Sequence, residues 1–158
     1  TLTWTMGVLG REFSAGEFVK QMREWGKASR AMGAFHEKHD IYMTPAIAGP
    51  PVEIGALLPT PAETFALKSI NTLKLGKIYK LSGLIDQMAV DGLSKTPFTQ
   101  LANLTGQPAM SVPLVWTSGG LPCGIQFIGR FADEAALLRL AGQLENERPW
   151  FEKRPPLK

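Results

Sequence analysis

The segment from Ser14 to about Lys38 constrains the fold most, because it predicts one long amphipathic helix. Ser14 and Glu17 have the spacing of a capping box, in which each side chain can satisfy the other residue's free backbone N–H. The apolar residues that follow recur at helical spacing, with lysine and arginine interspersed. They are Phe18, Met22, Trp25, Met32 and Phe35. We therefore expect a helix that buries one face against the rest of the fold.

Further start signals predict helices in the middle of the chain. Thr60 and Glu63 form a second capping box, with a proline between them at the first helical position. Gly76 and Gly83 are expected to break or bend the helical stretch that follows. The helices expected here cover about 61–75 and 77–90.

The last third of the chain combines short helices with extended runs. Pro97 offers a first helical position and Gly106 a C-terminal stop, so a short helix is expected between them. Asp133 can cap a final helix that runs to about Glu147. Its expected apolar face comprises Leu137, Leu138, Leu140, Ala141 and Leu144. The strands expected in the whole chain cover about 40–44, 110–116 and 124–129.

Helical segments alternate with extended ones, so the fold class is α/β, with helices packed over a sheet. Three short strands are few for so many helical faces, and we expect the sheet to be incomplete within this chain. The chain also opens without methionine or a helix cap, as though entered midway. No repeat or linker separates two parts, so no second domain is expected.

The composition is that of a globular protein and excludes several classes. The chain has 158 residues, 44% hydrophobic and 20% charged, which disfavours disorder, collagen and coiled coil. Its net charge of +3 is too small to indicate a nucleic-acid or anionic-membrane partner. A single cysteine fits a reducing compartment. We expect neither a membrane span nor a signal peptide, and a cytoplasmic location.

No catalytic constellation is found within the chain. His36 and His39 lack the spacing of the metalloprotease motif and a third ligand, so we interpret them as a solvated polar helix end. Cys123 has no neighbouring histidine and is interpreted as a buried or half-buried structural thiol. Ser111 lacks the flanking glycines of a nucleophile elbow. No metal or cofactor is therefore expected.

Two stretches carry a family resemblance. The sequences PFTQLANLTGQPAMSVP at 97–113 and GLPCGIQFIGR at 120–130 strongly resemble the C-terminal region of the amidase signature family. Segments 42–45, 133–138 and 2–4 are similar to further parts of that family, in the same order and spacing. The resemblance covers nearly the whole chain and is strongest to bacterial amidases of the 6-aminohexanoate cyclic-dimer hydrolase type.

The resemblance implies amide hydrolysis by a serine nucleophile, with a second serine on a cis peptide and a lysine as general base. In the family these residues lie in the N-terminal part, so none is assigned in this chain. The resemblance implies a mixed sheet covered by helices, of which residues 1–158 form a C-terminal segment. That segment would supply fold and substrate-pocket walls, and alone it is expected to be inactive.

The same resemblance gives substrate-pocket candidates. The family places its Thr-x-x-x-Asn segment, here Thr99 and Asn103, and the preceding loop near the acyl pocket. Asn103 has an alternative role in hydrogen bonding within the fold. Family members that use glutamine tend to carry an acid where Thr96 stands here. A generic or hydrophobic amide is therefore the expected substrate.

Two other interpretations stay open. The chain could be a free-standing non-catalytic binding or scaffold module derived from an amidase. It could also be an independent metal- or thiol-dependent enzyme that uses His36, His39 or Cys123. The expected partner of the parent amidase is a small-molecule amide, with no nucleic acid and no membrane. The resemblance also allows for a homodimer.

Overall fold

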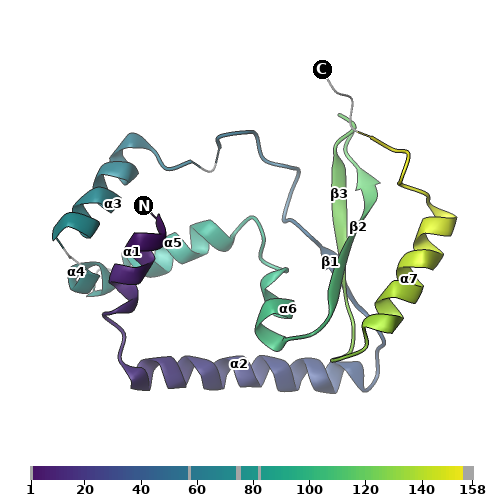
Figure 1. Ribbon diagram of the computed structural model, residues 1–158, viewed down its shortest axis with the longest axis horizontal. Coiled ribbons are helices and arrows are strands. Elements are labelled where there is room, and N and C mark those ends of the chain that lie inside the picture. The colour runs from purple at the N-terminus through teal and green to yellow at the C-terminus, as the bar shows by residue number, and fades with distance from the viewer. Residues whose placement is uncertain (1, 57, 74–75, 82, 155–158) are drawn as a thin grey trace. The chain divides into compact units, whose positions relative to one another are not determined.

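The structure, a computed structural model, describes residues 2–56, 58–73, 76–81 and 83–154 (Figure 1). Its contacts divide the chain into two compact units. Unit 1 comprises residues 1–22 and 52–93, and unit 2 comprises residues 23–51 and 94–158. The long helix α2 (Ala15–His36) begins in unit 1 and ends in unit 2. Within the described ranges, no helix is both long and apolar enough to cross a membrane.

Unit 1 is built from helices. Besides the start of α2, it contains α1 (Leu2–Gly10), α3 (Pro61–Leu73), α4 (Gly76–Leu81) and α5 (Leu84–Leu93). Helix α1 contacts both α3 and α4. The side chains buried in this unit include Thr5, Leu9, Leu67 and Ile70. The sequence reasoning did not predict α1, whose apolar residues are spread around the helix without one marked face.

Lys80 connects α4 to the turn between α1 and α2 and to the start of α2. Its Nζ donates hydrogen bonds to the Glu12 carbonyl at 2.8 Å and to Glu17 Oε1 at 2.7 Å, and it lies 4.6 Å from the centroid of the Phe13 ring. The expected capping box is confirmed, since the Ser14 N–H donates to Glu17 Oε2 over 2.7 Å. The hydrogen bond from Lys80 and those from Ser14 lower the pKa of Glu17 to about 2.

The second expected helix start is also confirmed. The Thr60 N–H donates to Glu63 Oε2 at 2.7 Å, and the Glu63 N–H donates to Thr60 Oγ1 at 3.2 Å. The hydrogen bonds from Thr60 lower the pKa of the Glu63 carboxyl. Gly83, with φ of +72°, separates α4 from α5, as the sequence predicted.

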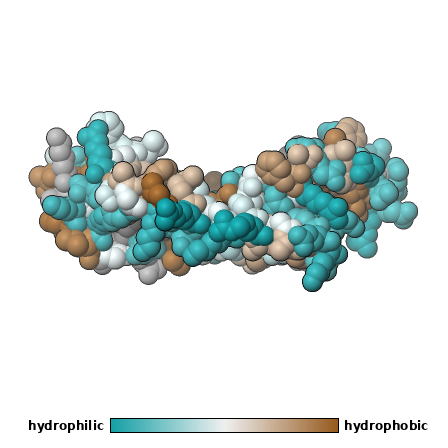
Figure 2. All heavy atoms as spheres, turned by 90° about the horizontal axis from the view of Figure 1, so that it is seen from below, coloured by the Kyte–Doolittle hydropathy of each residue, from teal (hydrophilic) through white to brown (hydrophobic). Residues whose placement is uncertain are grey.

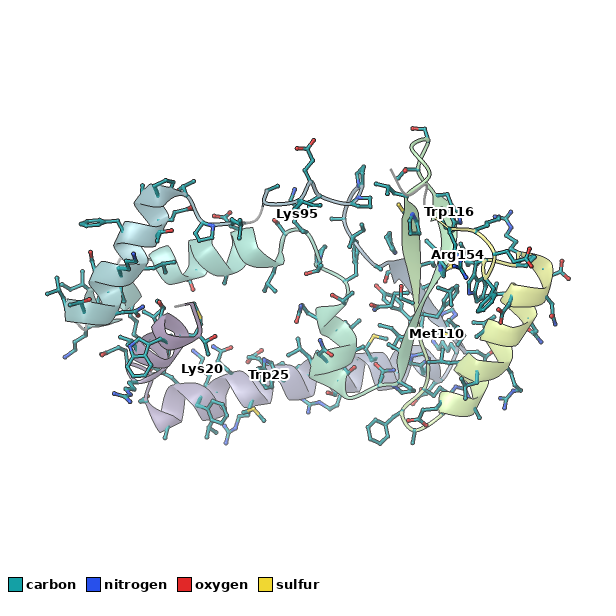
Figure 3. The ribbon with its side chains drawn as sticks, turned by 45° about the horizontal axis from the view of Figure 1, so that its top comes forward. Lys20, Trp25, Lys95, Met110, Trp116 and Arg154 are labelled. Carbon is teal, nitrogen blue, oxygen red and sulfur yellow. The ribbon has the colours of Figure 1, made fainter. Side chains whose placement is uncertain are left out.

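Unit 2 contains the sheet, with its described strands in the order β1 (Tyr42–Pro45), β3 (Pro122–Ile128) and β2 (Ala109–Trp116). Both described pairs are antiparallel. Figure 1 shows α6 (Gln100–Thr105) and α7 (Glu134–Glu147) on opposite sides of this sheet. The core between the sheet and α7 is formed by Val112, Phe127 and Leu137, with Ile41, Met110, Leu114, Ile125, Leu140, Leu144 and Trp150 packed against it (Met110 is labelled in Figure 3).

Two local expectations in unit 2 are wrong. Helix α6 begins at Gln100 and not at Pro97, because the Thr99 hydroxyl bonds the Thr96 carbonyl and residues 97–99 form a turn. Leu138 is 72% exposed and does not belong to the apolar face of α7. The cap of α7 is confirmed, since the Ala136 N–H donates to Asp133 Oδ1 at 3.2 Å.

Many large apolar side chains are exposed in both units. Figure 2 shows hydrophobic residues on the surface among hydrophilic ones. Those that are more than two thirds exposed are Ile54, Leu58, Phe65, Leu81, Phe131, Leu138 and Phe151. Single apolar side chains scattered over a surface are common in folded proteins, and these residues are distributed over both units.

Candidate substrate-pocket wall

The face of the sheet turned away from α7 carries three polar residues in register. Thr44 of β1 pairs with Gln126 of β3, and Gln126 pairs with Ser111 of β2. Directly opposed residues in antiparallel strands point to the same face, so these side chains lie side by side. Thr44 and Gln126 are only 8% and 5% exposed. We call Thr44, Gln126 and Ser111 the polar row.

Gly124 makes room for the polar row. A Cβ atom at this position would overlap Ser111 Oγ and would lie 3.2 Å from the Cβ of Ala46. Ala46 follows β1, and its N–H donates to the Gly124 carbonyl at 2.9 Å. The missing side chain therefore lets the Ser111 hydroxyl sit directly over the central strand.

The predicted pocket residues lie on the segment that leads into and through α6. Thr96 and Thr99 are half-buried and brought together, since the Thr99 hydroxyl donates to the Thr96 carbonyl at 3.2 Å. The Lys95 carbonyl accepts the N–H of Ala48 at 2.9 Å, which places this segment beside the chain that follows β1 (Lys95 is labelled in Figure 3). Asn103 is exposed on α6 and, in the described part of the chain, makes no side-chain hydrogen bond.

Two buried atoms of the polar row have no hydrogen-bond partner in the part of the chain that the structure describes. They are Thr44 Oγ1 and Gln126 Nε2. Leaving a buried polar atom unpaired costs about 1–3 kcal/mol, and native proteins pair most such atoms with protein or ordered water. The row therefore offers a free hydroxyl and a free amide donor within a buried part of unit 2.

Comparison with known proteins identifies the family. The chain matches the amidase family over residues 3–138. The chain belongs to the amidase family. It is 32% identical to a lipoamidase from Enterococcus faecalis over 92% of this chain and 20% of that protein. It is 37% identical to a 6-aminohexanoate-cyclic-dimer hydrolase from Paenarthrobacter ureafaciens over 64% of this chain and 20% of the hydrolase.

The fold agrees with this assignment to the amidase family. The structure of 6-aminohexanoate cyclic dimer hydrolase complexed with substrate matches 92% of this chain and 27% of its own, with a TM-score of 0.60 and 27% identity. The chain spans about a fifth of the length of the relatives it matches. The family resemblance read from the sequence, and the α/β fold class expected with it, are thereby confirmed.

The interpretation of His36 as a solvated residue is wrong. His36 is 6% exposed, and its Nδ1 lies 3.0 Å from the His39 carbonyl. Since a carbonyl only accepts, Nδ1 donates this hydrogen bond, and Nε2 is buried without a partner in the described residues. The Phe35 ring packs edge-on against His36 and stacks on His39. The half-buried state of Cys123 agrees with its interpretation.

The sequence did not indicate the contacts that two glutamines make in unit 2. Gln126 belongs to the polar row. Gln107 connects the end of α6 to the end of β3, because its Nε2 donates to the Gly129 carbonyl at 2.8 Å and its Oε1 accepts from Thr105 Oγ1 at 2.9 Å. Both glutamines lie in the stretches that carried the resemblance, but only strand register and loop geometry reveal what they contact.

We call the polar row together with Thr96 and Thr99 the wall, and its chemistry is hydrogen bonding. The polar row and the two threonines before α6 supply hydroxyl and amide groups, all of them uncharged. Hydroxyl activation requires a base within hydrogen-bond reach, and these residues do not include one. Among the described residues, no group of histidine, cysteine and carboxylate side chains could hold a metal ion. The arrangement thus provides uncharged hydrogen-bonding groups and, in this part of the described chain, no base beside them.

Proposed function

We propose that this chain supplies the C-terminal portion of a serine-dependent amidase that hydrolyses carbon–nitrogen bonds of amides. The family match over residues 3–138 carries this proposal. The likeness to a hydrolase whose structure holds a substrate supports it, because that likeness extends over 92% of the chain. Residues 1–158 act as one segment of the catalytic domain, and their role is to complete the fold and to wall the substrate pocket.

The catalytic lysine and the two serines of the family lie outside residues 1–158 in this proposal. The uncharged wall supports that division, since its hydroxyls have no base beside them. The isolated chain is therefore inactive. Purified chain incubated with a fatty-acyl anilide should release no aniline. Release that persists after repurification and is abolished by Ser111→Ala or Thr99→Ala would refute this part of the proposal.

The substrate is a small uncharged amide with an apolar acyl group. Thr96, Thr99 and Asn103 are the proposed pocket residues, with Thr96 in the position that carries an acid in glutamine-using relatives. In the enzyme encoded by the complete reading frame, Thr96→Asp should raise KM for the apolar amide at least tenfold, because a half-buried charge would face an apolar group. Thr96→Ser is the matched control and should stay within about threefold. Equal KM values for the two variants would remove Thr96 from the pocket.

The alternative is a non-catalytic binding or scaffold module. The reading frame upstream of Thr1 distinguishes this alternative from the amidase. A lysine codon followed by a glycine- and serine-rich stretch supports the amidase, and a start codon immediately before Thr1 supports the module. For the amidase we propose a cytoplasmic enzyme that acts on a small molecule, does not bind nucleic acid, and is able to form a homodimer.

A further inference from the structure

Unit 1 contains a groove between α1 and α3 that the proposed function does not use. Its volume is about 470 Å³, within the range of small-molecule pockets. Trp4, Gly7, Val8, Arg11 and Glu12 line it from α1 and the turn after it, and Asn71 lines it from α3. All of these residues belong to unit 1.

The apolar part of the groove has space for a flat molecule. A Cβ atom added at Gly7 would meet no other atom within 4 Å, so the backbone of α1 is open at this point. One turn earlier, the Trp4 side chain is 65% exposed. An exposed indole beside an open glycine provides an aromatic surface on which a planar apolar group can pack.

The polar part of the groove contains a buried acceptor that has no donor partner in the described part of the chain. Asn71 Oδ1 is buried and has no partner among the described residues. Asn71 itself is one of the residues that line the groove. Arg11 is exposed at the same groove and, within the described ranges, forms no ion pair. The two side chains thus offer one acceptor for an N–H group and one donor for a carbonyl oxygen.

We propose that this groove binds a small neutral amide with an apolar, preferably aromatic, body. The N–H of the ligand bonds Asn71 Oδ1, its carbonyl accepts from the Arg11 guanidinium, and its apolar body covers Gly7 beside Trp4. An ester of the same shape keeps the carbonyl and the body but leaves Asn71 unpaired. A carboxylate additionally faces the acidic side chain of Glu12. The inference is independent of the proposed function, because the pocket residues proposed there lie in unit 2.

The test is a titration of the ¹⁵N-labelled chain with benzamide, followed by amide chemical shifts. Benzamide should give saturable shifts in α1 and α3, and methyl benzoate should bind about tenfold more weakly, since one hydrogen bond is missing. Asn71→Leu should weaken benzamide about tenfold and leave methyl benzoate unchanged. Gly7→Leu should abolish binding of both by filling the groove, whereas Gly7→Ala, the matched control, should retain it.

Several outcomes would overturn the inference. They are the absence of saturable shifts with benzamide, equal affinities for the amide and the ester, and an Asn71→Leu variant that binds benzamide like the parent chain. Binding that survives Gly7→Leu would place the ligand elsewhere. The spectrum of each variant without ligand reports whether it is folded, so lost binding is distinguished from lost structure. None of these results affects the hydrolysis assay of the proposed amidase.

Discussion

Replacing Gly124 with alanine tests how tightly the polar row is packed. The new Cβ would overlap Ser111 Oγ and approach Ala46 Cβ to 3.2 Å. Overpacking of this kind costs about 1–3 kcal/mol. Gly124 does not have positive φ, so alanine also gains about 0.4–1 kcal/mol by restricting the unfolded chain. We therefore expect a net loss of about 1–2 kcal/mol in the free energy of unfolding.

The assay is urea unfolding followed by circular dichroism, applied as a double-mutant cycle with Ser111→Ala. Removing the hydroxyl eliminates the overlap and leaves the Ser111 Cβ 3.8 Å from the new atom. Gly124→Ala should therefore cost about 1 kcal/mol less in the Ser111→Ala background than in the parent chain. Gly142→Ala is the control, because nothing lies within 4 Å of its Cβ position and alanine should stabilise α7 by about 0.5–1 kcal/mol. A Gly124→Ala variant as stable as the parent would show that Ser111 rotates away freely and would refute the reasoning.

Three further predictions concern other contacts. The folded-state pKa of Glu17, about 2, is below its ordinary value of 4.5, so this group stabilises the fold above pH 4.5 and the contribution is lost as pH falls toward 2. Lys80→Met should raise the Glu17 pKa in a carboxyl NMR titration and flatten the acid side of the stability profile. An unchanged pKa would contradict the hydrogen bond from Lys80 to Glu17. Thr44→Val should leave the free energy of unfolding unchanged or raise it by about 1–3 kcal/mol, because it removes a buried hydroxyl that has no partner among the described residues; a loss of about 1 kcal/mol or more in urea unfolding would show that Thr44 Oγ1 has a partner. Asp133→Ala should destabilise the chain by about 1 kcal/mol through loss of the α7 cap, whereas Asp133→Asn should retain most of the stability, and equal losses in thermal unfolding would argue against a capping role.

Local signals predicted the helix starts well because their physics is local. A capping box needs only residues three apart, and both boxes are present with the expected bonds. Gly83 and Gly106 end helices in the left-handed conformation, which depends on backbone sterics alone. The beginning of α6 was misplaced because two local rules compete there. Pro97 suits a helix start, but the Thr99 hydroxyl satisfies the Thr96 carbonyl in a turn instead.

Tertiary features were beyond local reasoning. The burial of His36 depends on what packs around the end of α2, which the polar sequence around it does not reveal. The polar row exists only because β1 and β2 both pair with β3 in one particular register, and a shift by one residue would turn Gln126 to the other face. The three pocket candidates came from family resemblance, and two of them, Thr96 and Thr99, are in direct contact.

The uncharged character of the wall limits what this chain can contribute to amide hydrolysis. A hydroxyl attacks an amide only when a base accepts its proton and fixed dipoles stabilise the developing oxyanion. The Thr99 hydroxyl donates a hydrogen bond to the Thr96 carbonyl, which cannot act as that base. Ser111 lies over a glycine and beside an amide, and neither group accepts a proton at neutral pH. The polar row and the two threonines before α6 therefore supply hydrogen-bonding groups but no base, so the proposed hydrolysis requires a nucleophile and a base other than these residues.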